Sequence, residues 1–169
     1  MNNVTRPNFI SKIYFNFIYK CISKIIIENQ KKNILDFGCG TGNLKKKLSH
    51  TNINIFNYDK DEKLTDIKNW KEIDFDTIVF CQVLMYIDKK NIIEIFKEIN
   101  NRKKIIDIIV LFSTQSFLNK IFALLLGHFS AHKNTTTLPV EEEEICLENF
   151  ILVKRKNYFF FKLLYLKNN

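Results

Sequence analysis

Residues 34–42 read ILDFGCGTG, an apolar run that ends in three closely spaced glycines. The apolar residues predict a short buried strand, and the lysine-rich residues 43–49 after the glycines predict a helix. Gly38, Gly40 and Gly42 permit a tight turn and let the backbone approach a ligand that any Cβ would displace. The stretch therefore indicates a strand, a glycine turn and a helix, the opening unit of many α/β domains.

The spacing of the glycines and the acidic residue before them narrow the kind of ligand. A dinucleotide-binding turn places its third glycine three positions after the second, whereas Gly42 follows Gly40 by two positions. Asp36 adds a negative charge at the end of the strand, which disfavours a pyrophosphate and suits an ammonium or sulfonium group. We therefore expect a cationic ligand rather than a dinucleotide.

The rest of the chain alternates between helical and extended patterns. Helices are predicted for residues 9–27, 89–100, 116–126 and 139–147, the last with Pro139 near its start and Asn149 as a left-handed stop. Strands are predicted for residues 53–58, 76–81 and 105–112, and a final hairpin for residues 151–155 and 158–166, separated by the polar Lys156-Asn157. This alternation predicts an α/β fold with a doubly wound, mostly parallel sheet that closes with an antiparallel pair.

Length and composition bound the remaining choices. A chain of 169 residues without an internal repeat predicts a single domain. The net charge of +8 comes from lysines spread along the sequence, so nucleic acid is not an expected partner, while a peripheral membrane contact stays open. The four cysteines lack zinc-type spacing, so we expect free thiols and no metal. The first residues lack a signal-peptide pattern, which favours a cytoplasmic location.

At residues 34–42 the sequence resembles the first motif of the class I S-adenosylmethionine-dependent methyltransferases, and the resemblance extends over residues 33–167. It implies S-adenosyl-L-methionine as the cofactor, methyl transfer as the activity, and a Rossmann-like sheet with a reversed C-terminal strand. The chain departs from the family at one place, because only about sixteen residues separate Asp59 from Asp76. We expect the fold to be trimmed around the third strand, of which residues 64–67 are the best remnant.

The resemblance also implies which residues hold the cofactor. Asp59, followed by Lys60, ends the second strand, where the family has the acidic residue that binds both ribose hydroxyls. Asp66 stands where an acidic residue would meet the adenine amino group, and it equally fits a solvent-facing loop. The glycine turn and the end of the strand at residues 76–81 complete the expected site: Asp36, Phe37, Gly38, Cys39, Gly40, Cys81 and Gln82.

The acceptor side of the site is predicted less closely. Residues 1–30 are expected to form a helical lid over a cofactor-binding core of residues 31–169, and the apolar segments 9–27 and 117–129 favour a small, apolar or lipid-like acceptor. RNA or protein substrates, and a non-catalytic binding module, are the alternatives. His132 is a candidate general base, although its position also suits an exposed loop histidine.

Overall fold

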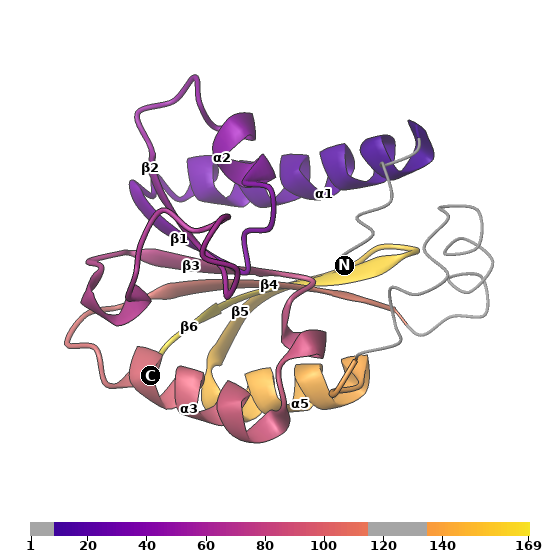
Figure 1. The fold of residues 1–169 in the computed structure, drawn as a ribbon. Coiled ribbons are helices and arrows are strands. Elements are labelled where there is room, and N and C mark those ends of the chain that lie inside the picture. Colours follow the sequence, from indigo (N-terminus) through magenta and orange to yellow (C-terminus); the bar gives the residue numbers. More distant parts are fainter. Residues whose placement is uncertain (1–8, 115–134) are drawn as a thin grey trace.

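The computed structural model describes residues 9–114 and 135–169 (Figure 1). Within these residues six strands form one sheet in the order β2-β1-β3-β4-β6-β5. The strands β1 to β4 are parallel, and β6 is antiparallel to both β4 and β5. Their bounds are β1 (Asn33–Phe37), β2 (Asn54–Tyr58), β3 (Thr77–Cys81), β4 (Asp107–Ser113), β5 (Ile151–Asn157) and β6 (Phe161–Lys167). The predicted sheet with a reversed C-terminal strand is confirmed.

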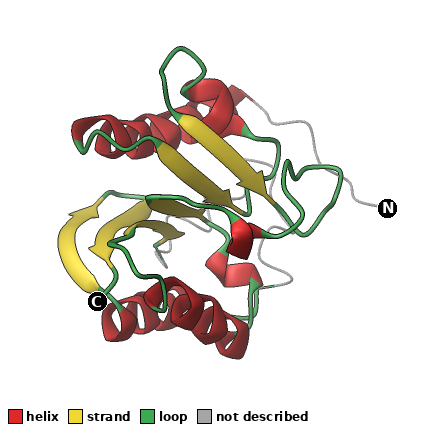
Figure 2. Cartoon of the chain, turned by 90° about the vertical axis from the view of Figure 1, so that its left-hand side faces the viewer, coloured by secondary structure: helices red, strands yellow, loops and turns green. Residues whose placement is uncertain are grey.

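Helices cover both faces of the sheet (Figures 1 and 2). One face carries α1 (Phe9–Glu28) and α2 (Asn43–Lys47), and the other carries α3 (Lys89–Asn100) and α5 (Pro139–Asn149). Two short 3-10 turns, η1 (Trp70–Glu72) and η2 (Leu84–Tyr86), lie between β2 and α3. None of the described helices is long and apolar enough to span a bilayer. The helix predicted for residues 116–126 lies outside the described residues.

Two local predictions near the C-terminus are wrong. The helix α5 continues through Asn149, which does not take a left-handed conformation. Its side-chain amide donates instead to the carbonyl oxygen of Ile145, at 2.8 Å. The hairpin turns at residues 158–160 and not at Lys156-Asn157, because β5 is a solvent-exposed edge strand in which polar residues continue the pairing with β6.

Each face of the sheet buries its own apolar cluster. The cluster on the α1 side includes four isoleucines of that helix: Ile18, Ile22, Ile25 and Ile26. The cluster on the opposite face is built from side chains of β3, β4, α3 and α5, among them Phe80, Val110, Phe96 and Ile145. A fully buried Ile contributes about 1.5–3 kcal/mol. The C-terminal half of α1 therefore belongs to the core, and the helical lid expected for residues 1–30 stays a prediction.

The segment between β2 and β3 replaces the missing third strand with an irregular, well-packed path. The predicted remnant at residues 64–67 is not a strand, although the N–H of Asp66 and the hydroxyl of Thr65 both donate to the carbonyl of Asn57, at 2.9 and 3.0 Å. Trp70 of η1 is buried in the core, in contact with Phe37. The trimmed edge is thus anchored both to β2 and to the interior.

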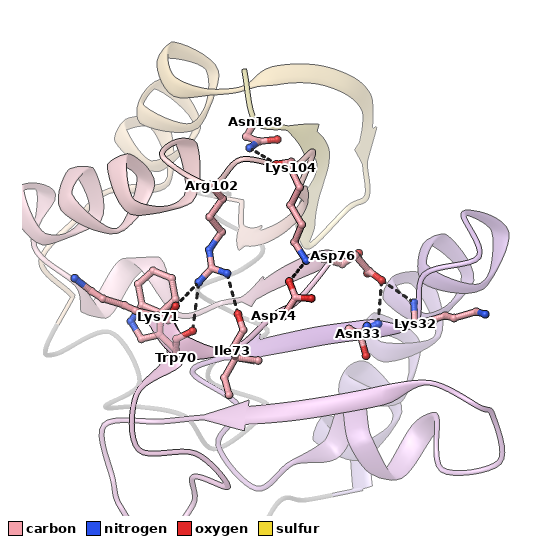
Figure 3. A network of polar contacts seen from close by, with 11 residues as sticks. Lys32, Asn33, Trp70, Lys71, Ile73, Asp74, Asp76, Arg102, Lys104 and Asn168 are labelled. Carbon is pink, nitrogen blue, oxygen red and sulfur yellow. Dashed lines mark hydrogen bonds and ion pairs between the residues drawn. The ribbon is translucent and has the colours of Figure 1, made fainter.

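Arg102, just after α3, holds the end of this segment (Figure 3). Its guanidinium donates to the carbonyls of Ile73 and Lys71, at 2.8 and 2.9 Å. The same group lies over the Phe75 ring, 4.1 Å from its centroid. Nearby, the carboxylate of Asp76 accepts hydrogen bonds from the backbone N–H groups of residues 32 and 33, which ties the segment to the start of β1.

Replacing Arg102 by alanine tests whether this cap stabilises the trimmed edge. Arg102→Ala leaves two carbonyls without their donor and removes the contact with Phe75, so the free energy of unfolding should fall by about 2 kcal/mol. Urea denaturation followed by the fluorescence of Trp70, the single tryptophan, measures the change. The neighbouring exposed residue supplies the control, Lys103→Ala, and equal unfolding midpoints for the two variants would contradict the role of Arg102.

Candidate functional site

The register of the sheet brings the predicted site residues to one edge. Phe37 of β1 pairs with Tyr58 of β2 on one side and with Phe80 of β3 on the other. The residues that follow these strands therefore emerge side by side at the carboxyl edge. The chain leaves β1 toward β2 and returns to β3 on the opposite side, so this edge is the topological switch point at which α/β sheets bind ligands.

The three glycines of the turn have positive φ angles but different surroundings. A Cβ on Gly38 would lie 2.2 Å from Cγ2 of Val83, so this glycine permits a close contact within the protein. A Cβ on Gly42 would lie 3.1 Å from the side-chain nitrogen of Asn57. A Cβ on Gly40 would meet no atom within 4 Å. Gly40 is the glycine that borders open space, as expected where backbone and ligand approach each other.

Asp59 connects the end of β2 to the glycine turn. One carboxylate oxygen accepts a hydrogen bond from the N–H of Gly40 at 3.0 Å, and the other accepts from the N–H of Asp61 at 3.0 Å. The backbone N–H groups of Gly38 and Cys39 donate to the carbonyl of Tyr58. Each carboxylate oxygen has a second lone pair, so Asp59 retains the capacity to accept hydroxyl protons from a ribose.

Asp36 is a buried carboxyl at the end of β1, only 2% exposed. It forms no hydrogen bond with any other described residue. Burial, and secondly the negative charge of Asp59, raises the pKa of Asp36 to about 7. Buried polar groups are normally paired, and this carboxyl has the surroundings expected of one that receives a cationic ligand. The cofactor edge is thus locally acidic in a chain whose net charge is +8.

Cys39 lies in the middle of the glycine turn and is buried. Burial raises the pKa of its thiol to about 12, with further contributions from Asp36, Asp59 and Asp66. Its Sγ lies 3.4 Å from the carbonyl oxygen of Leu64. A neutral, buried thiol is a poor nucleophile, so the sulfur of Cys39 is expected to pack rather than to react.

Gln82 has an unusual backbone at the carboxyl end of β3. Its φ angle of 55° lies in the left-handed region, which costs energy for a residue other than glycine and is frequent at functional sites. Its side-chain Nε2 donates to the hydroxyl of Tyr14 at 2.7 Å and lies 3.4 Å from Oγ of Ser113. Residues from α1, β3 and β4 thus converge at this point.

Tyr19 of α1 also reaches this edge, although it is not among the predicted site residues. Its phenol lies beside Asp36 and Cys81, and burial followed by these two neighbours raises the pKa of Tyr19. The apolar periodicity of residues 9–27 predicts a helix but does not show that Tyr19 reaches the edge of the sheet. A polar residue of a helix that packs over the glycine turn is the one signal that could have pointed to it.

The remaining predicted residues lie at the exposed margin of this cluster or outside the described residues. The carboxylate of Asp66 forms an ion pair with Lys45 of α2, at 2.7 Å, and is largely exposed. Lys60 follows Asp59 and is also exposed. His132 lies outside the described residues. Of the predicted cofactor site, the structure therefore brings together the glycine turn, Asp36, Asp59, Cys81 and Gln82.

Two hollows flank the N-terminal half of α1. The first, of about 400 Å³, is apolar and lies between α1 and the β5–β6 turn; its lining is Ile13, Tyr14, Phe17 and residues 158–161. It shares Tyr14 with the hydrogen bond to Gln82. The second, of about 450 Å³, lies between α1 and α2 beside the glycine turn, and its lining includes Tyr19, Thr41, Asn43 and three lysines.

Comparison with known proteins agrees with this geometry. A family model described as a methyltransferase domain matches residues 13–137. Magnesium protoporphyrin IX methyltransferase from Synechocystis, solved with bound SAH, is 13% identical over 97% of this chain and 89% of its own, with a TM-score of 0.70. A protein from Pyrococcus horikoshii is 12% identical over 92% of each chain, with a TM-score of 0.69. The sequence matches no curated protein.

A further solved structure has a similar degree of likeness. An S-adenosylmethionine-dependent methyltransferase from Clostridium acetobutylicum is 15% identical over 89% of each chain, with a TM-score of 0.60. Such low identities establish the shared fold and not a shared substrate. The family match covers well over half of the chain and includes the glycine turn, Asp59 and Gln82. The chain therefore belongs to the methyltransferase domain family, and it is an S-adenosylmethionine-dependent methyltransferase of class I.

Proposed function

We propose that this enzyme methylates a small, apolar or lipid-like acceptor that binds in the hollow between α1 and the β5–β6 turn. The supporting observation is the position of Tyr14, which lines this hollow and also accepts the hydrogen bond from Gln82 at the cofactor edge. The other lining residues are aliphatic or aromatic, including Ile13 and Phe17. An apolar ligand gains free energy from such a lining, whereas a charged one would lose its hydration there.

For the cofactor, we assign each residue of the edge a separate task. Asp59 accepts the ribose hydroxyls, Gly40 leaves room for the nucleoside, and the backbone of Cys81 and Gln82 lines the methionine portion. Asp36 faces the cationic end. When bound, S-adenosylmethionine supplies a methyl group on a positively charged sulfur, which is already a strong electrophile. The task left to the protein is to hold an acceptor atom in line with it and to exclude water.

Tyr14 has the properties of an orienting group rather than a base. Burial is the main cause that raises its pKa to about 12, so the phenol stays protonated at neutral pH. A neutral hydroxyl can hold a polar atom of the acceptor but cannot remove its proton. The amide of Gln82 and the hydroxyl of Ser113 lie beside it and offer further neutral hydrogen-bonding groups.

A polar substitution in the hollow tests the nature of the acceptor. Phe17→Gln places an amide in the lining, so KM for an apolar acceptor should rise at least about tenfold while cofactor affinity stays unchanged. Incorporation of labelled methyl groups into solvent-extractable lipids and small aromatic acceptors provides the assay. The matched control is Ile27→Gln, an exposed position of the same helix. Labelling of RNA or protein, with no labelling of extractable material, would contradict the proposed acceptor class.

The glycine turn allows a test of where the cofactor lies. Gly40→Ala adds a methyl group to open space at a φ of 52°, which costs about 1–2 kcal/mol of stability but should abolish the thermal stabilisation by S-adenosylhomocysteine. Gly42→Ala carries a similar backbone cost at a φ of 67°, and its methyl group points at Asn57 instead. This control should keep the stabilisation, and equal stabilisation of both variants would place the ligand elsewhere.

Asp36 gives both stability and cofactor affinity a dependence on pH. In the folded protein its pKa is about 7, against an ordinary value of 3.8. Between these values the folded state keeps a proton that the unfolded state has lost, so stability falls as the pH rises from about 4 to 7. Asp36→Asn should therefore be more stable than the wild type at pH 8, by at most about 4 kcal/mol, and the difference should vanish toward pH 4.

Cofactor affinity should show the opposite trend. Protonation of Asp36 below a pH of about 7 removes its attraction for the cationic cofactor, so affinity for S-adenosylmethionine should weaken as the pH falls from about 8 to 6. Asp36→Asn should bind weakly at all these values. Calorimetry measures the affinity, and Asp61→Asn, an exposed carboxylate of the neighbouring loop, is the control. An unchanged pH dependence in Asp36→Asn would remove this residue from the site.

A further inference from the structure

Large apolar side chains are exposed on one continuous surface beside the first hollow. On α1, Phe9, Ile13 and Phe17 recur every four residues and are 76%, 54% and 46% exposed. Phe159, at the tip of the β5–β6 turn, is 63% exposed. Ile13, Phe17 and Phe159 line the same hollow, and Figure 1 shows the first turns of α1 next to this turn. We call these four residues, together with the exposed lysines Lys12, Lys20 and Lys24 of α1, the α1–hairpin face.

The charged side chains of α1 before its last residue are all positive. Lys12, Lys20 and Lys24 are exposed on the same helix, and no acidic residue occurs in α1 before Glu28, its last residue. Lys24 forms an ion pair with Glu28, whereas Lys12 and Lys20 form none with any described residue. Two further exposed lysines of α2 adjoin the helix, and one of them, Lys47, donates to Asn16 at 2.9 Å.

Exposed apolar residues interleaved with lysines on one helix are the pattern of a helix that lies in the interface of a membrane. The aromatic and aliphatic side chains would enter the boundary between headgroups and acyl chains, while the lysines would meet anionic lipid headgroups. α1 is anchored to the sheet by its four buried isoleucines and does not qualify as a spanning helix. It can therefore lie on a membrane but not cross it.

We propose that the α1–hairpin face docks the enzyme onto an anionic lipid bilayer. The positive charge favours anionic over zwitterionic lipid, and the four apolar side chains favour insertion over a loose electrostatic contact. Three of these apolar side chains also line the hollow, so an apolar acceptor dissolved in the bilayer would reach Tyr14 without crossing water. The inference goes beyond the proposed function, because docking requires neither cofactor nor methyl transfer.

Co-sedimentation with vesicles tests the docking directly. The full chain should bind vesicles of equal parts phosphatidylcholine and phosphatidylserine, should bind pure phosphatidylcholine at least about tenfold more weakly, and should be released as salt is raised. Two double variants should each weaken binding at least about tenfold. One is Lys12→Glu with Lys20→Glu, and the other is Phe9→Ser with Ile13→Ser. All four positions are exposed, so cooperative melting should be retained.

Matched variants on other surfaces control for net charge and apolar area. The charge control is Lys89→Glu with Lys90→Glu, which changes the net charge by the same amount on α3, on the other face of the sheet. The apolar control is Ile105→Ser with Ile151→Ser, which removes two isoleucines that are 68% and 55% exposed. Both control variants should bind the anionic vesicles like the wild type. Equal losses in test and control variants overturn the proposal, since they would reveal only a diffuse charge effect.

Two other outcomes would also overturn the docking. In the first, the protein binds single-stranded RNA through Lys12 and Lys20 and does not bind vesicles. This result would assign the α1–hairpin face to nucleic acid. The other is self-association abolished by Phe9→Ser with Ile13→Ser in the absence of lipid, which would assign it to a second copy of the chain. Because the vesicle assay contains no cofactor or acceptor, its failure leaves the proposed methyl transfer untouched, and failure of methyl transfer leaves docking intact.

Discussion

The contact between Gly38 and Val83 is the constraint on which the carboxyl edge of the sheet depends. The two residues follow neighbouring parallel strands, and a Cβ at residue 38 would lie 2.2 Å from the valine side chain. Any larger residue would push the turn after β1 away from the end of β3. The hydrogen bond from Gly40 to Asp59 and the position of Gln82 both rely on this closeness, because they span the same three strand ends.

Features of the fold and of the candidate site could be predicted from the sequence where they depend on local patterns, and could not where they depend on contacts between residues far apart in the sequence. The glycine turn, Asp59 and Gln82 were predictable, since each directly follows a strand and parallel strands end at a common edge. Tyr14 and Gln82 are 68 residues apart, and no periodic pattern encodes their hydrogen bond. The ion pair of Asp66 with Lys45 was not predictable either, because it depends on how the shortened segment folds back onto α2.

The trimmed edge shows how irregular chain can take over part of the pairing of a lost strand. The outer side of β2 receives hydrogen bonds from Thr65 and Asp66 at a single carbonyl, in place of a full ladder. The carbonyls near the end of the segment are satisfied by Arg102, a side chain from beyond α3. A guanidinium can serve several acceptors at once because it carries five donors in a fixed plane. One arginine thus holds the end of the irregular segment in place.

α1 is packed more firmly against the sheet over its C-terminal half than over its N-terminal half, and this difference has a mechanical consequence. Residues 18–26 are held to the sheet by buried isoleucines, whereas residues 9–17, about 13 Å of helix, carry the half-buried Tyr14 and Phe15 and the exposed Phe9, Ile13 and Phe17. Among the described side chains of this part of α1, Tyr14 is the most N-terminal one that packs against the core cluster. The hydroxyl of Tyr14 accepts a hydrogen bond from Gln82, a residue with a strained backbone. A displacement of the first turn of α1 would therefore act on Tyr14 and, through this hydrogen bond, on the backbone at the end of β3.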